Sequence, residues 1–172
     1  MPVNQMYFPG NNNFDEINDA FDKHAPDGVD LCLAGVGPEG HIAFNEDPNF
    51  RHVEVTEEEF IEDRTRLVSV NTSTVDMDAL VAGCGDRQAI PPFAVTIGPH
   101  DILKAKRIEV IFFAGRWHRT PLRETLFRKP TMRFPGSLLK LRKFRDGLQM
   151  RKKITIWATP VETWPVFSKT MS

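Results

Sequence analysis

Apolar spacing in one segment of the chain and a capping signal in another predict helices. In the first segment, Phe14, Ile17 and Phe21 fall on one stripe. The second segment opens with Thr56, and Glu59 follows three residues later, which is the spacing of a capping box. The pattern predicts helices over residues 15–24, 56–63 and 117–127.

Apolar runs between and after these helices predict strands over residues 29–34, 94–98, 108–114 and 153–158. The first run has the length and composition of a buried parallel strand, and we expect the next two to be buried as well. Residues 67–70 fit either a strand or an extended approach to a turn, and residues 71–92 are rich in turn formers. Helices and strands that alternate in this way indicate an α/β fold.

Length and composition fit one globular domain with its own core, because the chain has 172 residues and 41% hydrophobic content. We expect a single domain over residues 1–172. The two cysteines, Cys32 and Cys84, make no disulfide framework, which favours a reducing compartment. The sequence has neither a signal-peptide pattern at its amino end nor an apolar run of membrane-spanning length. We therefore expect a cytoplasmic protein that makes no membrane contact.

Charge is divided unevenly along the chain. Residues 1–115 hold 8 Lys/Arg and 20 Asp/Glu, whereas residues 116–153 hold 13 Lys/Arg and 2 Asp/Glu. The basic segment fits a solvated face that pairs with the acidic part, or a sugar-phosphate anchor drawn from Arg116, His118 or Arg119. We expect no nucleic-acid partner, because the net charge is only −1 and no nucleic-acid-reading motif is present.

The segment 35–46 carries the most distinctive chemistry. Its glycines permit a tight turn directly after a predicted strand, which places His41 at the carboxyl end of that strand. A histidine of near-neutral pKa can both take and give a proton. A carboxylate that contacts one ring nitrogen fixes the tautomer, and Glu39 and Glu46 are the nearby candidates. No Cys/His cluster has the spacing of a zinc site, so we expect no metal.

The same segment matches the glycine pattern of a dinucleotide-binding turn at Gly35, Gly37 and Gly40. That interpretation needs a helix directly after the last glycine and an acid at the end of a strand about 20 residues later. Here Asp47-Pro48 favours a turn, and residues 57–60 look like the start of a helix. Both features argue against a dinucleotide site.

Residues 33–46 resemble the active-site signature of the glucosamine-6-phosphate deaminases, whose wider superfamily includes the 6-phosphogluconolactonases. The lactonases share the glycine turn and the histidine, but the ending Asn45-Glu46 points to the deaminase branch. Residues 90–98 and 101–103 resemble the strand and turn that follow the family's mobile lid. The resemblance is convincing over residues 29–115.

The resemblance implies a three-layer, mostly parallel Rossmann-like sheet that is incomplete at the amino side. It also implies conversion of glucosamine 6-phosphate to fructose 6-phosphate and ammonia, without a cofactor, by a homo-oligomer. His41 would open the sugar ring with support from Glu39 and Glu46. The substrate-binding residues would be Gly35, Gly37, Gly40, Asn45, His118 and Arg119. Asn45 equally fits a role in holding the loop through bonds to the backbone.

Three elements of the family site lack a clear counterpart in this sequence. Nothing before Val29 resembles the family's phosphate-cradling loop or the aspartate that moves the C2 proton. The lid arginine has no clear match, and Arg87 is the nearest candidate. The alternatives to an active deaminase are therefore a catalytically impaired sugar-phosphate binder and a hydrolase like 6-phosphogluconolactonase.

Overall fold

The computed structural model describes residues 6–10, 12–51, 54–141 and 153–160. Its helices are α1 (Phe14–His24), α2 (Glu57–Glu62), α3 (Thr72–Val81), α4 (Pro99–Lys104) and α5 (Arg119–Phe127). Its strands are β1 (Cys32–Gly35), β2 (Arg66–Ser69), β3 (Phe93–Thr96), β4 (Arg107–Phe112) and β5 (Lys153–Ala158). Short 3-10 helices cover Pro48–Arg51, Arg87–Ala89, Arg116–His118 and Pro135–Lys140.

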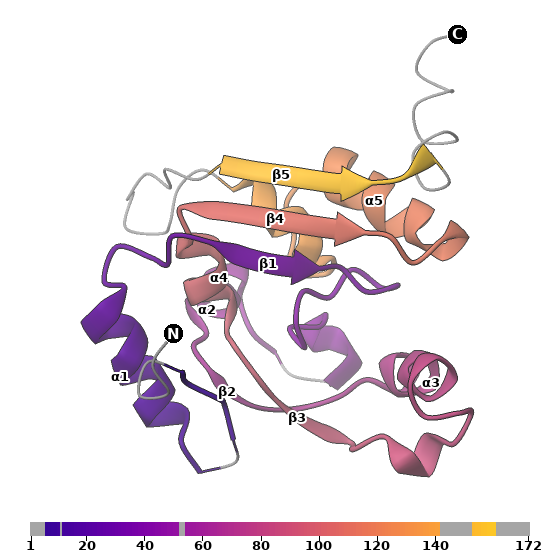
Figure 1. Ribbon diagram of the computed structural model, residues 1–172, viewed down its shortest axis with the longest axis horizontal. Helices are drawn as coiled ribbons and strands as arrows, with labels where there is room; N and C mark the ends of the chain where they lie inside the picture. Colours follow the sequence, from indigo (N-terminus) through magenta and orange to yellow (C-terminus); the bar gives the residue numbers. More distant parts are fainter. Residues whose placement is uncertain (1–5, 11, 52–53, 142–152, 161–172) are drawn as a thin grey trace, which may run out of the picture.

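Three of the strands form a parallel sheet in the order β1-β4-β5, with Gly35 beside Ile111 and Ile111 beside Trp157. Strands β2 and β3 form a separate antiparallel ribbon below this sheet (Figure 1). The chain therefore has the predicted α/β class with a mostly parallel sheet.

The core lies on one face of the parallel sheet. Ile108, Val110 and Phe112 of β4 are fully buried there, against residues of α4, α5 and the Pro135–Lys140 segment. In Figure 1 these helices lie behind the sheet. The 3-10 segment supplies Leu138 and Leu139, each 1% exposed. This packing fixes β4 and therefore the loops at its carboxyl end.

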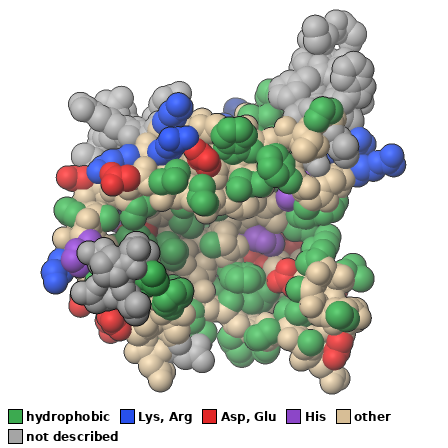
Figure 2. All heavy atoms as spheres, in the orientation of Figure 1, with side chains coloured by type: hydrophobic (Ala, Val, Ile, Leu, Met, Phe, Trp, Pro, Cys, Tyr) green, Lys and Arg blue, Asp and Glu red, His purple; other side chains and the backbone are tan. Residues whose placement is uncertain are grey.

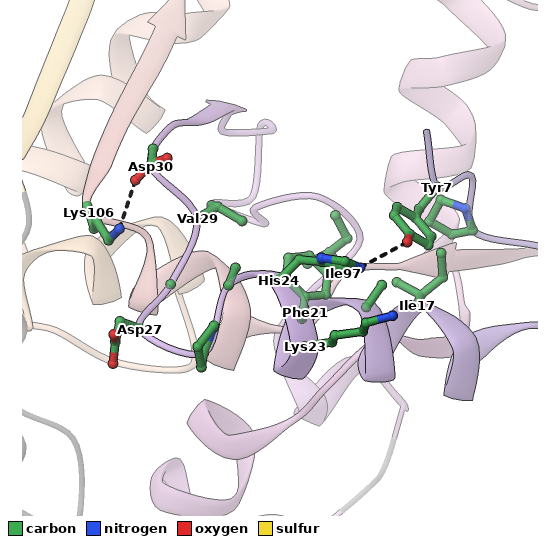
Figure 3. Close-up of a pocket in the computed structure, with 15 residues that line it drawn as sticks. Tyr7, Ile17, Phe21, Lys23, His24, Asp27, Val29, Asp30, Ile97 and Lys106 are labelled. Atoms are coloured by element: carbon green, nitrogen blue, oxygen red, sulfur yellow. Dashed lines mark hydrogen bonds and ion pairs between the residues drawn. The ribbon is translucent and has the colours of Figure 1, made fainter. Parts of the chain in front are cut away.

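The other face of the sheet stays open within the described residues. Leu33 of β1 is 65% exposed, and Ile111 of β4 and its partner Trp157 of β5 are 39% and 48% exposed. Figure 2 shows apolar side chains gathered over this face. The prediction that residues 29–34 form a buried strand is therefore wrong about burial, because β1 is parallel but lies at the edge of the sheet with alternate residues exposed.

Most of the predicted elements are confirmed, including the capping box of α2, in which Thr56 and Glu59 exchange hydrogen bonds. Of the two alternatives for residues 67–70, the strand is found, as β2 over Arg66–Ser69. The strand predicted over residues 94–98 is found as β3, which pairs antiparallel with β2; Thr96 is buried, and Ala94, Val95 and Ile97 are partly buried. Helix α3 lies in a segment from which only turns were expected. Residues 142–152 of the basic segment lie outside the described residues.

A charged network ties α1 to the antiparallel ribbon and to α4. Arg64 donates to Asp101 from Nε over 3.0 Å and to Asp22 from Nη2 over 3.0 Å. Burial raises the pKa of Asp101, and the neighbouring Arg64 guanidinium opposes that rise. Asn18 adds a side-chain bond to the backbone nitrogen of Thr65, so three elements are held around one guanidinium.

Within the described ranges, no helix combines the length and apolar character needed to cross a membrane.

Candidate active site

The candidate site lies at the carboxyl edge of the parallel sheet. The loop after β1 carries His41, and the loop after the neighbouring strand β4 leads into the Arg116–His118 turn. The β1 loop folds back on itself, since Gly37 N donates to His41 O over 2.9 Å and Val36 bridges to Ile42. Loops at this edge of a parallel sheet are the usual position of ligand sites in α/β folds.

Two glycines of the loop are required by their surroundings. A Cβ on Gly37 would lie 2.1 Å from Cε1 and Nε2 of His41, so the imidazole rests directly on the Gly37 backbone. Gly40 has φ +88°, and a Cβ there would lie 2.3 Å from the Phe134 ring. By contrast, a Cβ on Gly35 would meet nothing within 4 Å. The loop sequence thus fixes the position of His41 and leaves open space beside Gly35.

His41 is half-buried and is held by a residue of α3. Its Nδ1 lies 3.4 Å from Oγ1 of Thr74, and the same oxygen lies 2.5 Å from Oε1 of Glu46. Burial lowers the pKa of His41, while the negative charges of Glu46, Asp78 and Glu39 oppose that shift. The balance leaves a neutral imidazole as the favoured form at neutral pH.

Both predicted carboxylates meet the amino-terminal end of α3. Glu46 is 3% exposed, and its Oε2 accepts from Asn71 N over 2.7 Å. Glu39 is exposed, and its Oε2 accepts from Asn71 Nδ2 over 2.9 Å and from Ser73 Oγ over 2.5 Å. Backbone and hydroxyl donors at a helix amino terminus stabilise negative charge, so both acids are held in place.

The structure brings His41, Glu39 and Glu46 together, with α3 as their common contact. We expected a carboxylate to contact a ring nitrogen of His41. Instead, the Thr74 hydroxyl stands between the imidazole and Glu46. Sequence reasoning missed this residue and its neighbours Asn71 and Ser73. A run of Asn, Thr and Ser at 71–74 is a helix-start signal that could have identified them.

The remaining predicted residues take supporting positions. Asn45 is fully buried, and its amide nitrogen donates to Ile42 O and Ile97 O while its oxygen accepts from Arg66. Its side chain therefore holds the loop, and the expected substrate contact stays a prediction.

His118 is 7% exposed, and its Nδ1 accepts from Ala114 N over 2.9 Å. Its ring packs edge-on against Phe112. These contacts support the turn after β4, and a phosphate contact by His118 stays a prediction. Arg119 begins α5 directly beyond it. Arg87 forms an ion pair with Asp76 of α3 at 2.5 Å, on the exposed surface.

In the part of the chain that the structure covers, no group of three His, Cys, Asp or Glu side chains is arranged to hold a metal ion. Cys32 and Cys84 are both free thiols, and burial raises the pKa of Cys32.

Comparison with known proteins finds glucosamine-6-phosphate deaminases that are similar to part of this chain. No protein-family model matches the chain. A glucosamine-6-phosphate deaminase of Halothermothrix orenii is 34% identical over 113 residues, which is 66% of this chain and 42% of that protein. One from Caenorhabditis elegans is 32% identical over 84 residues, covering 49% of this chain and 27% of that protein.

The fold has a solved relative as well. A structure of a monomeric glucosamine-6-phosphate deaminase of the NagB superfamily matches 83% of this chain and 49% of its own, with a TM-score of 0.63 at 24% identity. The chain spans less than half the length of the curated relatives it matches. It is therefore a homologue of part of the glucosamine-6-phosphate deaminases and shares the fold of their superfamily.

Proposed function

We propose that the chain acts on glucosamine 6-phosphate as a deaminase, forming fructose 6-phosphate and ammonia in amino-sugar catabolism. The observation that carries this proposal is the hydrogen-bonded group of His41, Thr74 and Glu46 at the carboxyl edge of the sheet. We infer the substrate from the similarity to glucosamine-6-phosphate deaminases. The geometry supplies a proton-transfer group in the loop after β1, where the His41 ring rests on the Gly37 backbone.

The reaction begins with opening of the sugar ring, which the His41 site is suited to perform. The anomeric hydroxyl loses a proton and the ring oxygen gains one as the bond between C1 and that oxygen breaks. A neutral imidazole takes the first proton and, once protonated, gives one back to the ring oxygen. Glu46 and Glu39 lie close enough to favour the protonated imidazole that forms between these two events.

The later steps move the C2 proton to C1 and hydrolyse the resulting imine, which releases ammonia. We assign no residue of this chain to the C2 proton. For the phosphate group we propose Arg119, because it begins α5 at the sheet edge that carries the His41 loop. Its guanidinium suits a phosphate through charge and bidentate geometry.

We also propose that the chain forms one domain and self-associates. Leu33, Ile111 and Trp157 expose apolar surface on the open face of the parallel sheet, although Glu109 lies beside Leu33. Soluble proteins usually cover such patches. Analytical ultracentrifugation of the wild type and of Trp157→Ser tests self-association. We expect the wild type to associate and the variant to lose that association, whereas two monomers would contradict the proposal.

We propose a cytoplasmic location, which the two free thiols fit.

The test of the function is ammonia release from glucosamine 6-phosphate, assayed beside hydrolysis of 6-phosphogluconolactone. Wild-type protein should release ammonia, and His41→Gln should lower the rate by ~10²–10⁴, the usual share of one acid–base group. Lactone hydrolysis without ammonia would replace the proposal with a hydrolase. Sugar-phosphate binding without turnover would instead indicate a catalytically impaired binder.

A further inference from the structure

The Thr74 side chain lies between His41 and Glu46 and contacts both of them. It lies on the first turn of α3 and is 3% exposed. A carboxylate without a proton can only accept hydrogen bonds, so the Thr74 hydroxyl donates to Glu46 across the 2.5 Å contact. Its oxygen is then left to accept, and the group facing it at 3.4 Å is His41 Nδ1.

We propose that Thr74 is a positioning residue that holds His41 with the hydrogen on Nδ1 and the free lone pair on Nε2. This inference rests on the proposed function for its chemical purpose. In that role Nε2 is the atom that exchanges protons with the sugar. A neutral imidazole has one donor and one acceptor nitrogen, so fixing the donor at Nδ1 commits Nε2 to act as the base.

Glu46 and His41, the two groups that Thr74 contacts, are each held in place by a further contact. Glu46 cannot turn away, because its other oxygen accepts from Asn71 N over 2.7 Å at the start of the same helix. The imidazole cannot slide toward the loop backbone, because its Cε1 and Nε2 already rest against Gly37. Thr74 thus bridges two groups that are each held from the opposite side.

The charged groups that face His41 come from two elements. Glu46 and Glu39 belong to the loop after β1, and Asp78 belongs to α3. Their charges act on the ring, whereas the Thr74 hydroxyl lies at hydrogen-bonding distance from its Nδ1. The acids therefore act on the charge of His41, and Thr74 acts on the choice of nitrogen.

The test compares three variants of the full chain. Thr74→Val keeps the shape and removes the hydroxyl, Thr74→Ser keeps the hydroxyl, and Thr72→Val makes the same change at an exposed position of the same turn. The tautomer of His41 is read from long-range proton–nitrogen NMR of protein labelled with ¹⁵N-histidine at pH 8. The His41→Gln spectrum identifies its signals among those of the five histidines.

The wild type, Thr72→Val and Thr74→Ser should show His41 with a protonated Nδ1. Thr74→Val should shift toward a protonated Nε2, the form that a free imidazole side chain favours in water. In deamination, Thr74→Val should lose about 10- to 100-fold in kcat, as expected for a lost hydrogen bond to a group that becomes charged, with KM within about threefold. Thr74→Ser should recover most of that loss.

The inference is overturned if wild-type His41 carries its hydrogen on Nε2, or if Thr74→Val leaves the tautomer unchanged. It is also overturned if Thr74→Ser loses as much activity as Thr74→Val, because the hydroxyl would then not be the cause. The NMR result is independent of turnover. A wild type that releases no ammonia but shows the predicted tautomer shift would refute the proposed function and support the role of Thr74.

Discussion

Replacing Gly37 by alanine tests how tightly the loop holds His41. A Cβ at position 37 would lie 2.1 Å from Cε1 and Nε2 of the imidazole and 2.7 Å from Cδ2. Ordinary carbon contacts begin near 3.4 Å, so the ring must retreat by about 1.3 Å or the loop must open. Retreat would disturb the contact between Nδ1 and Thr74.

A displacement of about 1 Å at a reacting group costs roughly 10²-fold in rate, so Gly37→Ala should lower kcat by about that factor. The added methyl also overpacks the site, and we expect a stability loss of about 1–3 kcal/mol. The assays are ammonia release, urea unfolding and the NMR signal of the His41 ring.

Gly35→Ala is the matched control, because a Cβ there meets nothing within 4 Å and Gly35 needs no left-handed backbone. It should leave the His41 NMR signal unshifted and the free energy of unfolding within about 0.5 kcal/mol of the wild type. If Gly37→Ala keeps the wild-type rate and an unshifted His41 signal, the ring does not rest on Gly37 as described.

Three further predictions follow from neighbouring contacts. Gly40→Ala should cost about 2–4 kcal/mol in urea unfolding, since φ +88° is unfavourable for alanine and the methyl meets Phe134, and a loss below that of Gly35→Ala would contradict this. The pKa of His41 is lowered in the folded state, so the unfolded chain binds more protons and stability should fall as pH drops below about 6.5; this component should vanish in His41→Gln, and identical pH profiles would oppose it. Arg64→Leu leaves Asp101 buried without its guanidinium and should cost about 1–3 kcal/mol, whereas Asp22→Asn at the exposed end should cost under about 1 kcal/mol, and equal losses would argue against the burial of Asp101 as the cause.

The sequence allowed the grouping of His41, Glu39 and Glu46 to be predicted because its signals are local. A strand, a glycine turn and a histidine between two acids lie within residues 29–46, and the structure places His41, Glu39 and Glu46 at one point. The requirement for Gly37 and Gly40 arises from contacts with the His41 and Phe134 rings. Only the first of these contacts lies close in sequence.

Helix α3 shows why the rest of the site was missed. Its first turn is Thr72, Ser73 and Thr74, and aspartates follow at 76 and 78, all residues of modest helix propensity. Leu80 and Val81 are exposed, so no apolar stripe marked the helix. Its hydrogen bonds to Glu39 and Glu46 stabilise it from outside the segment, and such tertiary contacts leave no periodic signal.

The burial of the strands was predicted less well than their positions. Residues 29–34 are as apolar as a strand covered on both sides, yet Leu31 is 48% exposed and Leu33 65%. An apolar run reports what a strand can bury, and the neighbouring layers decide what it does bury. The described residues supply helices on one face of this sheet only.

The central claim is that His41 exchanges protons with a sugar ring, and the rate of ring opening tests it most directly. NMR exchange spectroscopy can follow the interconversion of the α and β anomers of glucosamine 6-phosphate, which proceeds through the open chain. We predict that wild-type protein accelerates this exchange and that His41→Gln abolishes the acceleration. Equal exchange rates with wild type, with His41→Gln and without protein would contradict the account.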